Sequence, residues 1–257
     1  MLPTFTVWGV QFNTFPFVIF AGLIACVSTF MLSHKYNKLY CTIIFRMWPA
    51  ILGSAAFGAR LFSAIALMST SEYSFWHNLL YGGAVFYGGM IDGAAGLLIV
   101  CLARHYEFLT FSDVFVTLLP IGHAIGRMGC YLNGCCYGRK YTGILAAKYT
   151  VDGVSTTVFP TWFVEAGFCL VLFIYFHFIH KNNSTGNRTA IYLIAYSIYR
   201  FLIEFMRGDE IRGRYGFLSM SQIISMPMLL SGLCALYVSL KDSRENYLLL
   251  GREEYAN

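Results

Sequence analysis

The sequence predicts an all-α integral membrane protein with about seven transmembrane helices. Its 257 residues are 57% hydrophobic without counting glycine, and only 12% are charged, whereas an average soluble protein carries about 25% charged residues. A chain of this size has too little interior to hide so much apolar surface from water. The composition therefore excludes a soluble enzyme, a disordered chain and a nucleic-acid-binding protein. We expect one polytopic membrane domain over residues 1–257.

Seven apolar runs are long enough to be spanning helices, which need about 20 residues each. They are longer than transmembrane β-strands and apolar all round, so they favour helices over a barrel. The first and seventh runs contain no charged residue. In order, the predicted spans are Phe15–Leu32, Ile43–Met68, Gly82–Ala103, Phe111–Leu132, Trp162–Ile179, Thr189–Met206 and Ser221–Leu240.

Basic residues in alternate loops indicate the orientation. Lys35 follows the first span, Arg104 the third and Lys181 the fifth. The positive-inside rule places these loops in the cytoplasm, which leaves the N-terminus outside, the C-terminus cytoplasmic, and an extracytoplasmic loop at about 133–161. The opposite loops also carry basic residues, Arg139 among them. That excess is either noise or a means of binding an anionic ligand.

Several charged residues fall inside the predicted spans. A central Arg or Asp costs about 2.5–3.5 kcal/mol on insertion scales. Such residues usually face the bundle interior and pair, or contact an aqueous cavity; snorkelling or a purely structural ion pair is the alternative. The residues concerned are Arg46, Arg60, Asp92, Arg127, Glu165, Arg200 and Glu204.

The sixth span carries a stripe of charge. Tyr196, Arg200, Glu204 and Arg207 recur at intervals of four, four and three, which places them on one helical face. Arg, Glu and Arg on one face imply internal pairing with positive charge left over. This excess suits a phosphate or a carboxylate, which arginine binds in a bidentate fork.

A glycine-rich stretch follows in the fourth span and beyond it. Five glycines lie in the seventeen residues from Gly122 to Gly138, with Arg127 among them. They allow close backbone approach and predict a broken helix, which is tolerated at membrane depth only inside protein or beside a cavity. Gly82 and Gly83 begin the third span in a similar way. Small residues alone favour tight helix packing, but with Arg127 between them a ligand cavity is the preferred interpretation.

These motifs together resemble the prolipoprotein diacylglyceryl transferase family, a group of seven-helix bacterial membrane enzymes. The residues from Gly126 to Arg139 align without gaps to its signature Gly-Arg-x-Gly-Asn-Phe-x-Asn-Gly-Glu-x-x-Gly-Arg. The resemblance runs from about Gly53 to Met228, and it depends on the order and spacing of all the motifs. The other matching segments are Gly58–Leu61, Gly82–Ile91, Phe159–Ala166, Arg200–Arg207 and Leu218–Gln222.

The resemblance implies an activity and a location. The family moves the diacylglyceryl group of phosphatidylglycerol onto a lipobox cysteine in a prolipoprotein signal peptide, releasing glycerol phosphate, in the bacterial cytoplasmic (inner) membrane. The thiol must lose a proton, and the departing phosphate needs fixed cations. By this resemblance Arg127 and Arg200 hold the phosphate and are catalytic, Arg60 and Arg207 support them, and Glu204 orients the arginines.

The same resemblance assigns further substrate contacts. Asn133, Gly138 and Arg139 contact polar groups of the lipid or the peptide. The basic outer loops become an attractor for anionic lipid. No cofactor and no metal are expected.

Three positions depart from the family pattern. Its histidine is Tyr87 here, its asparagine is Cys130 and its glutamate is Cys135. Tyr87 has an unperturbed pKa of about 10 and is a poor base, but it can donate a hydrogen bond. His123 lies one turn before Arg127. It either replaces the family's histidine at the substrate or is a core histidine with satisfied hydrogen bonds. These changes leave two other functions open: a phospholipid-dependent transferase with another acceptor, and a non-catalytic lipid-binding or transport protein.

Cys130, Cys135 and Cys136 cluster near the expected outer surface. A disulfide, plain packing and a reactive thiol beside arginine are all compatible with the sequence. Zinc would require a fourth ligand at a recognised spacing, which the sequence does not offer.

Overall fold

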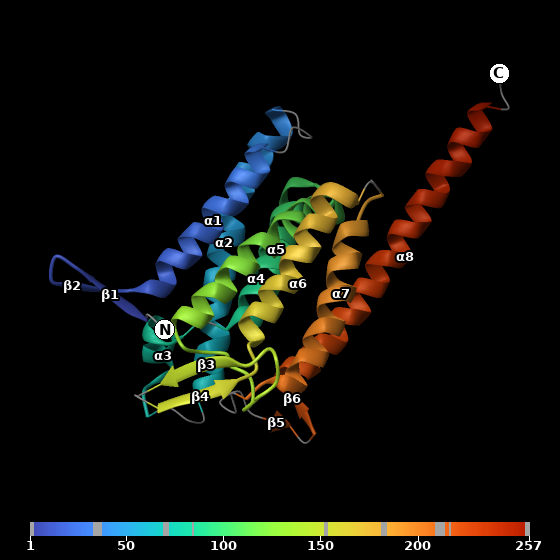
Figure 1. Ribbon diagram of the computed structural model, residues 1–257. Coiled ribbons are helices and arrows are strands. Elements are labelled where there is room, and N and C mark those ends of the chain that lie inside the picture. Colours follow the sequence, from blue (N-terminus) through green and yellow to red (C-terminus); the bar gives the residue numbers. More distant parts are fainter. Residues whose placement is uncertain are drawn as a thin grey trace. The chain divides into compact units, whose positions relative to one another are not determined.

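Seven helices of the computed structural model are long and apolar enough to cross a membrane. The structure describes residues 3–32, 38–68, 72–83, 85–151, 154–180, 184–208, 214–215 and 217–254. The helices confirm the predicted multi-pass membrane architecture (Figure 1). They are α1 (Thr14–Leu32), α2 (Lys38–Leu67), α4 (Phe86–Arg104), α5 (Phe108–Leu132), α6 (Thr161–Ile174) with a π-helical end η1 (Tyr175–Ile179), α7 (Asn187–Ile203) with a 3-10 end η2 (Glu204–Met206), and α8 (Met220–Glu254).

The third span begins later than predicted. Gly82 caps the short helix α3 (Phe75–Tyr81), and its N–H donates to the carbonyl of Asn78 at 2.9 Å. Gly82 is extended, with φ −68° and ψ 176°, and α4 starts only at Phe86. Gly82 and Gly83 therefore lie between α3 and α4 and not within a span.

The prediction of a broken helix after Gly122 is wrong. Helix α5 continues through Gly126 and Gly129 to Leu132. A Cβ on Gly122 would lie 2.8 Å from Cys26 Sγ of α1, and one on Gly129 would lie 3.1 Å from Val18. These two glycines let α1 pack closely, which is the usual role of small residues between membrane helices.

Within the described ranges, three two-stranded antiparallel hairpins accompany the helices, and none of them was predicted from the sequence. The second hairpin lies within the predicted loop at 133–161, of which residues 152–153 fall outside the described residues. The strands are β1 (Thr4–Val7) with β2 (Val10–Asn13), β3 (Ala147–Val151) with β4 (Val154–Val158), and β5 (Arg214–Tyr215) with β6 (Leu218–Ser219).

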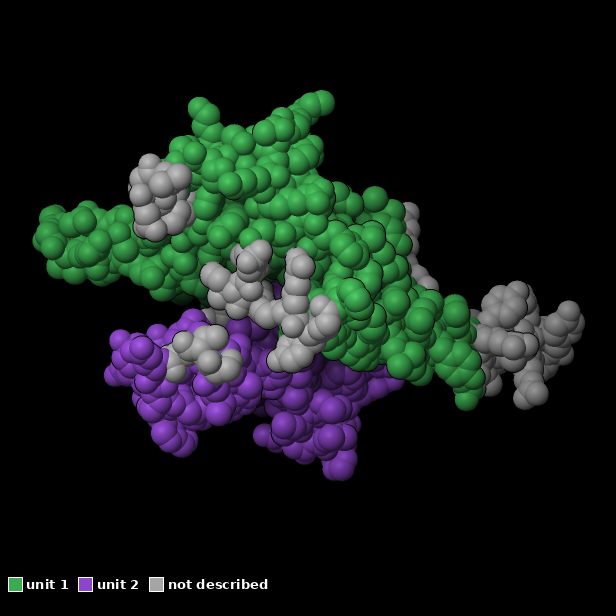
Figure 2. All heavy atoms as spheres, turned by 90° about the horizontal axis from the view of Figure 1, so that it is seen from below, with its two compact units in different colours: residues 1–32, 113–257 green, residues 33–112 purple. Residues whose placement is uncertain are grey.

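The chain divides into two compact units, coloured separately in Figure 2. The first comprises residues 1–32 and 113–257, and the second residues 33–112. In the first unit α1, α5, α6, α7 and α8 lie side by side in this order (Figure 1). The organisation as a single membrane domain stays a prediction.

Glycines also bring α2 and α4 of the second unit together. The N–H of Val85 donates to the carbonyl of Ala59 at 2.9 Å. A Cβ on Gly88 would lie 2.3 Å from the carbonyl oxygen of Gly58, and a Cβ on Gly58 would overlap the carboxylate of Asp92. The backbones of these helices thus meet at positions where only glycine fits.

The orientation also stays a prediction. Of the loop residues that indicate it, Lys35 and Lys181 lie outside the described residues.

We expect Gly88→Ala to destabilise the protein, because the new methyl group would meet the backbone of α2. Gly53→Ala is the matched control, since nothing lies within 4 Å of its Cβ position. In the control, alanine should be neutral or stabilise the helix by up to about 1 kcal/mol. Thermal unfolding in detergent measures both variants, and equal melting temperatures would contradict the proposed helix contact.

Candidate active site

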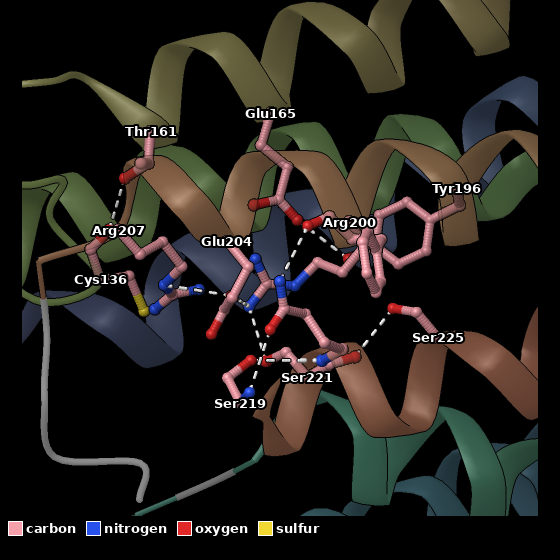
Figure 3. A network of polar contacts seen from close by, with 12 residues as sticks. Cys136, Thr161, Glu165, Tyr196, Arg200, Glu204, Arg207, Ser219, Ser221 and Ser225 are labelled. Atoms are coloured by element: carbon pink, nitrogen blue, oxygen red, sulfur yellow. Dashed lines mark hydrogen bonds and ion pairs between the residues drawn. The ribbon is translucent and has the colours of Figure 1, made fainter. Parts of the chain in front are cut away.

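A buried polar network connects α5, α6, α7 and α8 in the first unit. Arg127 is 6% exposed, and Glu165 and Arg200 are each 1% exposed. Figure 3 shows Glu165 of α6 pointing toward Tyr196 and Arg200 of α7. Since ionised groups are rarely buried unless they are paired, the partners of these residues define the site.

Glu165 lies at the centre of one half of the network. Its Oε1 accepts a hydrogen bond from Arg127 Nη2 at 2.7 Å and another from the hydroxyl of Tyr196 at 2.9 Å. His123 Nε2 lies 3.4 Å from the same oxygen. One carboxylate thus joins three helices. Glu165 is the only carboxylate in the predicted span Trp162–Ile179, and it was predicted as a charge inside a span but not as a site residue.

His123 is held between the members of this ion pair. Arg127 Nε lies 3.3 Å from His123 Nε2, one helical turn further along α5. The same nitrogen can accept from Arg127 or donate to Glu165, but it cannot do both at once. His123 is therefore a member of the network. Its predicted contact with the substrate stays a prediction.

The stripe of charge predicted on the sixth span forms the other half of the network. Arg200 Nη2 lies 2.9 Å from Glu204 Oε2, and Arg207 Nε lies 3.9 Å from the same oxygen. The predicted internal pairing is confirmed, although α7 ends at Ile203 and Glu204 begins the 3-10 turn η2. One carboxylate between two guanidinium groups leaves positive charge over.

Helix α8 contributes a hydroxyl to this half. Arg200 Nη2 donates to Ser221 Oγ at 3.0 Å. The start of α8 is a reciprocal cap in which Ser219 N donates to Gln222 Oε1 at 3.0 Å and Gln222 N donates to Ser219 Oγ at 3.2 Å. Such a capping box fixes the first turn of a helix, and it thereby positions Ser221 against Arg200.

The charges of the network do not cancel. Three guanidinium groups (Arg127, Arg200 and Arg207) face two carboxylates (Glu165 and Glu204). With His123 neutral, the network keeps one net positive charge. Charge interactions are strong at low effective dielectric, so the network suits a buried monoanion.

The signature motif reaches this network through its backbone. Gly138 N donates to the carbonyl of Phe159 at 3.1 Å, and Arg139 N donates to the carbonyl of Met206 at 2.9 Å. A Cβ on Gly138 would lie 2.3 Å from the oxygen of Phe159. Gly138 thus ties its loop to the end of α7, beside Arg207. The side chains of Arg139 and Asn133 are exposed.

Two of the predicted site residues belong to the second unit. Tyr87 lies in the first turn of α4 and is 3% exposed. Arg60 is exposed on α2, and its Nη1 donates to the carbonyl of Leu80. Arg46 is exposed as well. Burial in the interior is therefore found for Arg127 and Arg200, whereas the exposure of Arg46 and Arg60 agrees with the alternatives of snorkelling or an aqueous contact.

None of the three clustered cysteines, all of them described in the structure, is joined in a disulfide. Their sulfur atoms all lie within 4.8 Å of one another. Hydrogen bonding with Cys130 and Cys136, together with burial, raises the pKa of Cys135 well above its usual range. Cys135 is therefore protonated at neutral pH, which disfavours a ready thiolate nucleophile at this position.

Comparison with known proteins decides the family. The family model described as prolipoprotein diacylglyceryl transferase matches residues 3–238. The chain belongs to the prolipoprotein diacylglyceryl transferase family. It is thus a member of a family of multi-pass membrane transferases, in agreement with its seven apolar helices.

Relatives of similar length support this assignment. The chain is 30% identical over 239 residues to phosphatidylglycerol–prolipoprotein diacylglyceryl transferase 2 of Clostridium perfringens, a match that covers 88% of this chain and 91% of the relative. It is 26% identical over 234 residues to the phosphatidylglycerol–prolipoprotein diacylglyceryl transferase of Clostridium tetani, covering 89% and 94%. The enzyme of the same name from Finegoldia magna is 27% identical over 237 residues, covering 89% and 91%.

We expect Glu165→Ala to be strongly destabilising, because it leaves Arg127 buried without its carboxylate. Breaking a buried pair by removing one partner costs about 3–5 kcal/mol. Unfolding by SDS in mixed micelles measures the loss. Glu72→Ala is the control, since Glu72 is exposed and its removal should change stability by less than about 0.5 kcal/mol. A Glu165 variant as stable as the control would show that the ion pair does not hold the helices.

Proposed function

We propose that this chain transfers the diacylglyceryl group of phosphatidylglycerol to the lipobox cysteine of a prolipoprotein signal peptide, in the bacterial cytoplasmic membrane. The observation that carries the proposal is the buried network of three arginines and two carboxylates. Its single net positive charge matches the one negative charge of a phosphodiester. The two substrates are taken from the names of the relatives. The net positive charge of the network is a physical reason for binding an anionic lipid.

The main catalytic requirement of this reaction is stabilisation of the negative charge that develops on the departing phosphate. The thiolate sulfur forms a bond to the glyceryl carbon, and the carbon–oxygen bond to the phosphate breaks. Glycerol phosphate leaves with more negative charge than the diester carried, so a fixed cation stabilises the transition state more than the bound lipid. We assign this role to Arg127 and Arg200, with Glu204 holding Arg200 and Arg207 in place.

The remaining assignments concern the acceptor and the approach of substrate. Tyr87 contacts the acceptor thiol or the phosphate through its hydroxyl, and His123 positions Arg127. Asn133 and Arg60 contact polar groups of the substrates. The exposed side chain of Arg139 attracts anionic headgroups to the outer leaflet, in an orientation with the N-terminus outside and the C-terminus in the cytoplasm.

The proposal is tested by rescue of bacteria depleted of their own diacylglyceryl transferase. The wild-type chain should restore growth and the lipid modification of a lipobox reporter. No modification, with the protein present in the membrane, would overturn the proposal. Release of glycerol phosphate without modification of the reporter would instead indicate a transferase with another acceptor, as the changes at Cys130 and Cys135 allow.

Arg200→Lys tests whether the bidentate geometry of the guanidinium group is needed in addition to its positive charge. Lysine keeps the charge but loses the bidentate hydrogen bonds, so we expect kcat for transfer from phosphatidylglycerol to fall about 100-fold. Arg104→Lys, at the exposed end of α4, is the control and should keep wild-type kcat. The assay measures glycerol phosphate release from vesicles with a lipobox peptide; unchanged kcat in Arg200→Lys would remove Arg200 from the mechanism.

Tyr87→Phe tests the residue at the position of the family's histidine. Loss of the hydroxyl should lower kcat at least about tenfold, since positioned proton donors and acceptors typically contribute 100-fold or more. Tyr81→Phe is the control, because Tyr81 is 77% exposed. Full activity of Tyr87→Phe would remove the Tyr87 hydroxyl from the mechanism.

A further inference from the structure

Three thiols converge at the end of α5. Cys130 lies in the last turns of this helix, and Cys135 and Cys136 lie in the turn that follows. The three sulfur atoms are all within 4.8 Å of one another. The proposed transfer reaction uses none of them, so the convergence calls for a separate explanation.

The turn that carries two of these thiols is held by three side-chain hydrogen bonds. Tyr149 donates to the carbonyl of Gly134 at 2.7 Å, Trp162 Nε1 donates to that of Cys135, and Thr161 Oγ1 donates to that of Cys136 at 2.6 Å. Three successive carbonyls are thus fixed by residues of β3 and α6. The arrangement prevents the turn from relaxing away from Cys130.

The backbone of this turn is also strained. Gly134 has a φ of 70°, and Cys136 has a φ of 59°. A side chain in the left-handed region is uncommon and persists only when its surroundings hold it there. Residues adjacent along an extended chain point to opposite sides, whereas here both neighbouring thiols reach Cys130.

The separations are compatible with one metal ion, which would use all three thiols. A metal–sulfur bond of about 2.3 Å places the three sulfurs of a trigonal site about 4.0 Å apart, within the observed limit of 4.8 Å. A disulfide needs a sulfur–sulfur distance of about 2.05 Å and joins only two of the three thiols.

We propose that Cys130, Cys135 and Cys136 form a binding site for one thiophilic metal ion, with Cu(I) as the best match. Thiolate ligands select Cu(I) and zinc among the common metals. Structural zinc is almost always four-coordinate, and among the residues that the structure describes no His, Asp or Glu joins this group. Cu(I) is satisfied by three thiolates, and its binding releases the thiol protons to solvent.

The surroundings suit such an ion. Val158 and Trp162 are fully or almost fully buried and pack against the cysteines, so they limit access of water to the sulfurs. Three thiolates around one monovalent ion leave two negative charges. Arg127 interacts electrostatically with Cys130 and Cys136, and the side chain of Cys136 points toward Arg207 in Figure 3. The site is therefore adjacent to the arginine network of the transferase.

The test is an anaerobic Cu(I) titration of the reduced full-length protein in detergent, in competition with the chromophoric chelator bathocuproine disulfonate. The protein should withdraw one equivalent of Cu(I) from the chelator. Each of Cys130→Ser, Cys135→Ser and Cys136→Ser should weaken binding more than about 100-fold, since even outer-shell partners contribute 10–100-fold. X-ray absorption should then find three sulfur ligands.

Cys234→Ser is the matched control, because Cys234 is exposed on α8, and this variant should still bind one equivalent. Cys130→Ser leaves the strained turn untouched, so its circular dichroism and elution should match those of the wild type even where a turn variant misfolds. No withdrawal of Cu(I) by the wild type would overturn the proposal. Undiminished binding by Cys130→Ser, or two sulfur ligands instead of three, would overturn it equally.

Discussion

The ion pair between Arg127 and Glu165 is the interaction on which the first unit depends. A guanidinium group buried among membrane helices usually has a partner, and the partner of Arg127 comes from another helix at 2.7 Å. Because Glu165 also accepts from Tyr196, the pair fixes α5, α6 and α7 to one another. Arg200, Glu204 and Ser221 extend the same arrangement to α8.

The same pairing leaves one positive charge uncompensated. A network with as many carboxylates as guanidinium groups would be electrically neutral and would not attract an anion. This network has one carboxylate fewer than guanidinium groups, and we propose that a phosphodiester supplies the missing negative charge. In the proposed function one arrangement thus serves both stability and specificity, because the carboxylates that hold the arginines in place leave one positive charge for an anionic lipid.

The spans were predictable from the sequence because the thickness of the bilayer sets their length and composition. The pairing of Arg200, Glu204 and Arg207 followed from helical periodicity alone, since Arg200 lies in the last turn of α7 and the other two lie in or directly after the 3-10 turn that continues it. The partner of Arg127 was not predictable, because contacts between helices depend on packing that spacing does not encode. From the sequence, Gly122 and Gly129 were compatible either with a break in α5 or with close packing of another helix. The structure shows close packing of α1, which no local sequence pattern indicates.

The hairpins were not predicted, and for the three clustered cysteines the sequence left a disulfide, packing and a reactive thiol open. The turn between β1 and β2 places Trp8 and Gly9 at positive φ, and the alternation of Thr4 to Asn13 was a usable strand signal outside the apolar spans. The convergence of Cys130, Cys135 and Cys136 depends on the left-handed conformation of Cys136, which a residue other than glycine rarely adopts. Spacing in the sequence therefore argued only against zinc.

The central claim is that the buried network binds lipid through one uncompensated positive charge. Native mass spectrometry of the purified protein, offered equal amounts of phosphatidylglycerol and phosphatidylcholine with the same acyl chains, tests it most directly. The account predicts that the wild-type protein retains phosphatidylglycerol preferentially, because the choline ammonium cancels the phosphate charge of the competitor. Equal retention of the two lipids would contradict it.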